Sequence, residues 1–236
     1  MRITKSILKK IIKEEILLEM MDNPIAKMRQ FAADDHKNIK NIIQAYKLAG
    51  SIQNENMKRM AIDYFMRHFG DELHRINLGR ANLETSSPEG VNLKKASLQK
   101  ANLRGVDLKG VNLEEASLWW AGLKGANLEG ADLRGAKLQS ANLVEANLHR
   151  ANLRRANLEY AYMKKANLTE ANLEGAILKG AFAQGTNLAG ANLEGANLDV
   201  ARLKGAKYNS ETRFPEGFNP EELGMVLVQE DEEDTK

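Results

Sequence analysis

The amino-acid sequence predicts an all-β solenoid, a right-handed, four-sided β-helix over residues 76–210 that follows an α-helical N-terminal segment. Three observations predict this fold. From Ile76 to Ser210 the chain reads as 27 consecutive five-residue units in one register. The central residue is Leu in 23 of these units, and the residue two positions before it is Ala in 21. Unbroken internal repetition of this kind is typical of solenoids, in which each repeat contacts only its neighbours.

A period of five residues requires a chain that turns regular corners. An α-helix would distribute such a repeat around its circumference, and an extended strand would send successive central Leu residues to opposite faces. The chain is therefore expected to turn the same way after every unit, with the central Leu and the preceding Ala facing the axis. Four units then close one coil, and residues 20 apart lie above one another.

The remaining positions of each unit are expected to shape the corners. Asn or Asp before the central Leu can accept a hydrogen bond from nearby backbone, which explains its repetition without a binding site. Gly in the last position, as at Gly105 and Gly130, supplies the positive φ of a tight turn. The stretch Ser86-Ser87-Pro88 breaks the pattern, because Pro cannot donate to a ladder, and a loop or bulge is expected there.

These units carry the signature A-[ND]-L-x-x, as in Ala101-Asn102-Leu103, Ala131-Asp132-Leu133 and Ala191-Asn192-Leu193. In this the chain resembles the pentapeptide-repeat proteins. The resemblance implies almost seven coils, a rod roughly 33 Å long at about 4.8 Å per coil, and a non-catalytic scaffold that binds proteins. It also implies an alternative, since some relatives are DNA-mimicking gyrase inhibitors. The net charge of +5 over residues 76–210 disfavours that alternative, because a mimic of DNA is acidic.

The segments outside the repeats are expected to protect the ends of the solenoid. Helical apolar spacing predicts an amphipathic helix over 1–21, with Ile7, Ile11 and Ile12 on one side, and a helical hairpin that caps the solenoid over 22–75. A C-terminal cap is expected over 211–228, with a homodimer through this segment as the alternative. Residues 229–236 are expected to form a disordered acidic tail.

The first fifteen residues also resemble leaders of virion proteins from tailed bacteriophages. That resemblance implies a place in a phage particle. Some such leaders are removed by a maturation protease, and both Leu17-Leu18-Glu19 and Ile12-Lys13-Glu14 match its permissive cleavage motif. The composition otherwise indicates a cytoplasmic protein with no membrane partner. The sequence has no signal peptide and no apolar run near the roughly 18 residues of a membrane span.

No catalytic, cofactor-binding or metal-binding residue is expected, and the chain is predicted not to be an enzyme. The absence of Cys excludes a disulfide framework, thiolate zinc ligands and a cysteine nucleophile. The four His residues form no metal or triad pattern with acidic neighbours, and only His149 lies in the repeats.

Stacking at 20 residues predicts two candidate surfaces. Paired exposed tryptophans are good candidates for a protein contact; this surface holds Trp119, Trp120 and, two coils away, Tyr160. Ile7, Ile11 and Ile12 are the partner-binding candidates of the N-terminal segment. Interleaved basic and aromatic groups on another side suit an acidic partner or, with less support, a nucleic acid. That side is expected to hold Arg104, Lys124, Tyr162, Lys164, Lys165, Phe182, Arg202 and Lys204.

Overall fold

The computed structural model describes residues 92–229. They belong to a compact unit, Gly70–Lys236, that is separate from the unit Met1–Phe69. The predicted N-terminal helices, the partner-binding candidates Ile7, Ile11 and Ile12, the irregular stretch at 86–88 and the acidic residues 230–236 lie outside the described residues.

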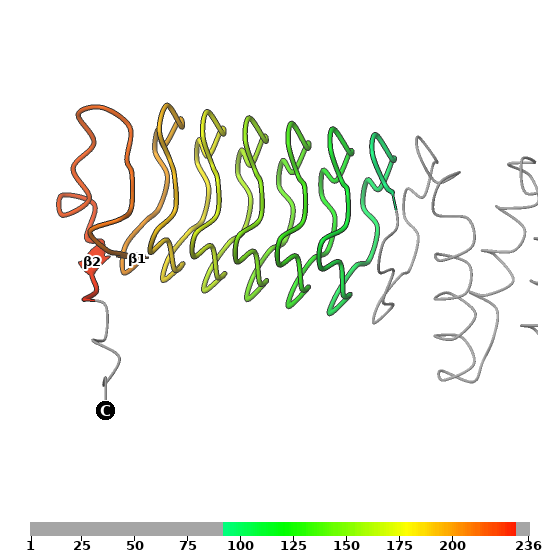
Figure 1. Cartoon of the computed structure of the whole chain (residues 1–236), viewed down its shortest axis with the longest axis horizontal. Helices are drawn as coiled ribbons and strands as arrows, with labels where there is room; N and C mark the ends of the chain where they lie inside the picture. Colours follow the sequence, from blue (N-terminus) through cyan, green and yellow to red (C-terminus); the bar gives the residue numbers. More distant parts are fainter. Residues whose placement is uncertain (1–91, 230–236) are drawn as a thin grey trace, which may run out of the picture. The chain divides into compact units, whose positions relative to one another are not determined.

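The described chain winds into successive coils of four five-residue units each (Figure 1). Parallel bridges join residues 20 apart, from Asn92 with Asn112 up to Asn187 with Lys207. Each bridge is made by backbone hydrogen bonds, as where Leu123 N–H donates to the Asn142 carbonyl at 2.7 Å. The predicted 20-residue stack of a four-sided β-helix is therefore confirmed over these residues.

Central Leu residues and the preceding small residues fill the axis of the solenoid. From Leu93 to Leu193 they are almost completely buried. Each buried Leu contributes on the order of 1.5–3 kcal/mol relative to an exposed one. Burial loosens only at the last coil, where Ala196 is 7% exposed, Leu198 9% and Ala201 8%. The core is therefore continuous but incompletely covered at its C-terminal end.

The corners are built as the sequence predicts, with one difference. The Asn142 side-chain oxygen accepts from the Val144 amide at 3.2 Å, and Asn157 accepts from Glu159 at 2.9 Å. The last residue of every unit from Lys95 to Gly205 has a positive φ, which Gly105 adopts at 61°. The difference is that 12 residues other than Gly also adopt it. The geometry of the corner therefore comes from the coil and is imposed on whichever residue stands there.

The chain leaves the last coil over residues 215–223 and then returns to it (Figure 1). Strand β1, Lys207–Tyr208, pairs in parallel with strand β2, Val226–Leu227. Arg213 pairs with Asn192 on a second side of the coil. Rings of Tyr208 and Phe214 meet edge to face at 5.5 Å. The C-terminal segment thus forms β-bridges with two of the four sides of the last coil, and on a third side the Gly224 carbonyl accepts from the Gly205 N–H at 2.7 Å.

Candidate interaction surfaces

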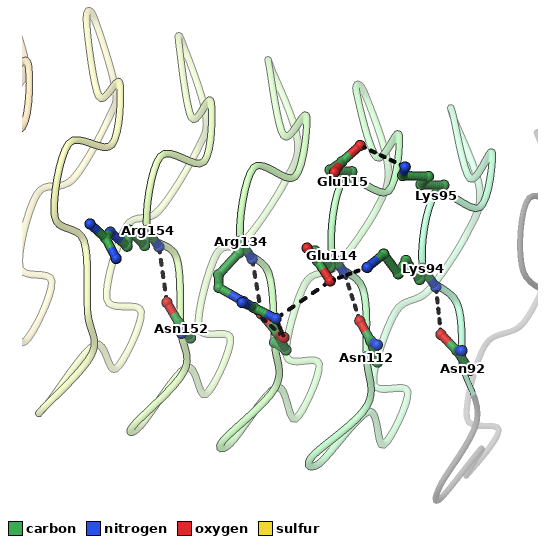
Figure 2. Close-up of polar contacts among 10 residues, drawn as sticks. Asn92, Lys94, Lys95, Asn112, Glu114, Glu115, Arg134, Asn152 and Arg154 are labelled. Carbon is green, nitrogen blue, oxygen red and sulfur yellow. Dashed lines mark hydrogen bonds and ion pairs between the residues drawn. The ribbon is translucent and has the colours of Figure 1, made fainter.

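The ion-pair side, defined as the outward residues flanking Leu93, Leu113, Leu133, Leu153, Leu173 and Leu193, neutralises its own charges. Opposite charges meet between neighbouring coils: Lys94 Nζ lies 2.6 Å from Glu114 Oε2 and Arg154 lies 3.0 Å from Glu174 (Figure 2 shows the Lys94–Glu114–Arg134 row). Arg134 also holds Asp132 at 2.6 Å, and this hydrogen bond lowers the pKa of the Asp132 carboxyl. Because these charges are already paired with one another, they are less available to a charged binding partner.

On the asparagine side, defined as the outward residues flanking Leu108, Leu128, Leu148 and Leu168, many polar side chains also bond to one another. Its amides form a ladder in which Asn147 Nδ2 donates to Asn127 Oδ1 at 3.1 Å and Asn167 donates to Asn147 at 3.1 Å. Ion pairs join Lys109 with Glu129 at 2.9 Å and Arg150 with Glu170 at 2.7 Å; His149 Nδ1 lies 2.8 Å from Thr169 Oγ1. His149 is thus held in a structural contact.

The basic side, defined as the outward residues flanking Leu103, Leu123, Leu143, Met163, Ala183 and Leu203, brings together the predicted basic residues. Like charges stack here: Lys124 follows Arg104 one coil on. The one ion pair of these basic groups within residues 92–229 is Lys124 with Glu145, at 3.8 Å. Six basic residues therefore face a single acidic one, Glu145. The six are Arg104, Lys124, Lys164, Lys165, Arg202 and Lys204.

Aromatic rings on the basic side are stacked on one another. Tyr162 and Phe182 lie 4.8 Å apart at an interplanar angle of 4°, and the Arg202 guanidinium lies 4.7 Å from the Phe182 ring centre. Although Phe182 stands beside Ala183, where the central Leu is missing, its ring does not turn inward and lies on outward Tyr162. Stacking between coils occupies ring faces that a nucleobase would need, so these rings suit nucleic-acid stacking poorly.

The tryptophan side, defined as the outward residues flanking Leu98, Leu118, Leu138, Leu158, Leu178 and Leu198, is the apolar one. Trp119 is 37% and Trp120 60% exposed, and their rings meet edge to face at 6.3 Å. Lys100 Nζ lies 5.5 Å from one ring centre and 5.0 Å from the other, a cation–π contact that orients the pair. Tyr160, 49% exposed, lies over Gly180, where an added Cβ would come within 2.5 Å of the ring.

Sequence reasoning missed two members of the tryptophan side. Ile177, 38% exposed, stands where most units carry Asn, and Val200, 76% exposed, stands where many carry Gly. Their signal was the same as that of the tryptophans: a large apolar residue at an outward position. Of the nine exposed large hydrophobic residues in the described chain, five now lie on this one side.

The tryptophan side ends at a groove beside the last coil. Its volume is about 360 Å³, and it lies between residues 196–199 and the loop 215–223. Val226 and Leu227 of β2 are exposed elsewhere on the end of the solenoid. A homodimer through the C-terminal segment stays a prediction.

Within residues 92–229, no group of three or more His, Asp or Glu side chains is placed to hold a metal ion. No helix in that part of the chain is long and apolar enough to cross a bilayer.

The chain is similar to several solved structures, of which QnrB1 supports the fold. QnrB1, a plasmid-mediated fluoroquinolone resistance protein, is 17% identical over 65% of this chain and 82% of its own, with a TM-score of 0.51. HetL, a pentapeptide repeat protein involved in heterocyst differentiation regulation in the cyanobacterium Nostoc sp. strain PCC 7120, is 25% identical over 65% and 85%, with a TM-score of 0.34. Rfr23, a pentapeptide repeat protein of the cyanobacterium Cyanothece 51142, is 33% identical over 50% and 90%, with a TM-score of 0.26. No curated protein sequence is significantly similar to the chain.

The repeats themselves match the family model of pentapeptide repeats, in eight copies. The matched residues are 72–110, 101–139, 111–150, 131–169 and 166–205, together more than half of the chain. The fold of that family is a right-handed quadrilateral β-helix, and its members are generally non-catalytic binding proteins. The chain belongs to the pentapeptide-repeat family.

Proposed function

We propose that this protein is a non-catalytic scaffold that binds a protein partner through the tryptophan side, with the solenoid as a rigid support. The observation that carries the proposal is the gathering of Trp119, Trp120, Tyr160, Ile177 and Val200 on one side of the solenoid. Exposed tryptophan and tyrosine are enriched among the residues that dominate binding energy at protein interfaces, and five of the nine exposed large hydrophobic residues of the described chain lie on this side.

The residues at three corners also distinguish the tryptophan side from the other three sides. Trp120, Tyr160 and Val200 occupy the last position of their units with φ of 63°, 56° and 50°. A left-handed conformation costs a residue other than Gly of the order of 1–2 kcal/mol, and it is least tolerable for a β-branched residue such as Val. The other three sides place Gly or a polar residue at this position. Nine polar residues adopt the same φ, so what distinguishes the tryptophan side is that large apolar residues stand at corners where they give no core packing.

The test compares the double variant Trp119→Ala, Trp120→Ala with a control, Tyr162→Ala. Tyr162 is an aromatic residue of similar exposure, 48%, on the basic side. Affinity purification of the full chain should recover the same partner with the parent and with the control, whereas the double variant should lose it. Circular dichroism should show that all three remain folded. Recovery of identical proteins with all three chains would refute the proposal.

A second candidate is binding of an acidic protein surface by the basic side. Six basic residues against one acidic residue, without the ion-pair ladders of the other sides, favour such a partner. The same charges disfavour the gyrase-binding alternative, because a DNA mimic presents acidic groups to a basic groove. Likeness to QnrB1 at 17% identity supports the fold and adds nothing to that alternative.

A further inference from the structure

The last coil presents an unpaired β-edge on the tryptophan side. One coil earlier, Leu178 N–H donates to the Asn197 carbonyl at 2.8 Å and Gly180 N–H donates to the Asp199 carbonyl at 2.9 Å. Within residues 92–229, the corresponding amides of Leu198 and Val200 donate no hydrogen bond, and the Ala196 carbonyl accepts none. Such groups form a ready template for one more strand.

The C-terminal segment leaves this edge open. It pairs with the adjacent ion-pair side through Arg213, and on the adjacent basic side the Gly224 carbonyl accepts from the Gly205 N–H at 2.7 Å. Strand β2 pairs with the opposite asparagine side, and residues 215–223 loop away from the coil (Figure 1). The groove between edge and loop is lined by Leu198 from the coil and by Pro215, Phe218 and Leu223 from the loop. Apolar walls beside free backbone groups are the two features that an extended peptide requires.

The core also lacks its next layer here. In earlier coils the following central Leu covers the one below, so that Leu178 is only 1% exposed, whereas Leu198 is 9% exposed. An apolar side chain placed above Leu198 would restore that cover. The occupant is therefore expected to carry one large apolar residue at the position of a central Leu.

The charges in the groove favour a basic residue in the bound segment. Asp199 and Glu216 also line the groove, and neither carboxylate makes an ion pair with another described residue. A Lys or Arg in the occupant would complement them. A second copy paired symmetrically at this edge would instead bring the acidic residues of both copies together, which is unfavourable.

We propose that an extended segment of a partner protein adds to Ala196–Val200 as a further parallel strand, because every bridge of the described coils is parallel. The segment would satisfy the amides of Leu198 and Val200 and the carbonyl of Ala196. It would place an apolar residue over Leu198 and a basic residue against Asp199 and Glu216. This inference rests on the protein-binding function proposed above and assigns the kind of segment that is bound.

The test begins with short random peptides displayed on phage and selected on the full chain. The selected peptides should combine an apolar residue with Lys or Arg. In the complex, hydrogen exchange measured by NMR should slow about tenfold or more at the amides of Leu198 and Val200, because strand pairing protects them. The variant Asp199→Lys, Glu216→Lys should weaken peptide binding about tenfold.

Two controls separate this inference from the proposed function. The variant Trp119→Ala, Trp120→Ala should bind the peptides as the parent does, since neither residue lines the groove. The charge-reversed variant should still fold, because both acidic residues lie at the surface. Selected peptides that leave both amides unprotected, or an absence of selected peptides, would overturn the inference. Protection of the amides by self-association alone, detected by sedimentation, would assign the edge to a second copy and also overturn it. Loss of the partner in the tryptophan variant would leave the proposed function standing in either case.

Discussion

Leu143 and Val144 are adjacent in the chain but occupy opposite environments, with Leu143 completely buried and Val144 half-exposed on the basic side. This difference follows from the position in the unit alone. The sequence therefore sufficed to predict the inward residues, because the repeat has one register over its whole length. The twelve left-handed residues other than Gly could not be predicted, since local preference argues against each of them and only the closed coil imposes the conformation.

The first prediction tests this register with a matched pair. Leu143→Asp should lower the free energy of unfolding by several kcal/mol, because it buries a charge in a core without a counter-ion. Val144→Asp should change it by only about 0.5 kcal/mol or less, because the new carboxylate is half-exposed and stands one coil from both Lys124 and Lys164. Urea denaturation measures both values. Similar losses in the two variants would show that the register is wrong.

The second prediction concerns pH. The hydrogen bond from Arg134 lowers the pKa of the Asp132 carboxyl in the folded protein. A lowered folded-state pKa stabilises the protein above the ordinary Asp value of about 3.9, and this contribution is lost as the pH falls through the folded-state value. Asp132→Asn should therefore lower the melting temperature slightly at pH 7 and have less effect at pH 3. The size is small because the pair is largely solvated. An equal effect at both pH values would contradict the assignment.

At the scale of the repeat and its four sides, the 20-residue stack correctly grouped the candidate residues. Arg104 and Lys204 lie on one side, and Trp120 and Tyr160 on another, as the numbering alone required. The repeat pattern could not predict the direction in which each side chain points. The Phe182 ring, for example, stacks on Tyr162 instead of entering the core. Tertiary neighbours decide that choice, because inward and outward rotamers are open to the same residue in an isolated unit.

The third prediction tests the strain at the corners of the tryptophan side. Val200→Gly should raise the free energy of unfolding by about 1 kcal/mol, because Gly adopts φ of 50° without steric cost and the exposed Val side chain contributes no core packing. Val144 is the matched control, since it is outward but has no positive φ. Val144→Gly should lower the stability by about 0.5–1 kcal/mol. Thermal or urea denaturation checks both, and a loss of stability in Val200→Gly would refute the strain argument.

At the scale of the whole solenoid, the backbone groups of the last coil have no following coil to pair with. Every coil satisfies the backbone of the one before, so the last coil must be satisfied by something outside the repeat. The sequence indicated that the repeats stop after Ser210. It could not indicate that the following segment leaves the tryptophan side of the last coil unpaired, because residues 211–229 follow no period from which pairing can be derived.

The last prediction follows from that ending. A chain truncated after Ser210 loses the bonds from Leu193 N–H to the Arg213 carbonyl and from Val226 N–H to the Ala206 carbonyl, together with the Phe214 ring on Tyr208. All four sides of the last coil then present unpaired backbone groups in one layer, and such an edge pairs with other chains. We expect a lower melting temperature and concentration-dependent association, measured by light scattering. A chain that lacks only residues 230–236 keeps each of these contacts and should behave as the full chain does. A truncated chain that stays monomeric and equally stable would show that the C-terminal segment contributes nothing to the solenoid's end.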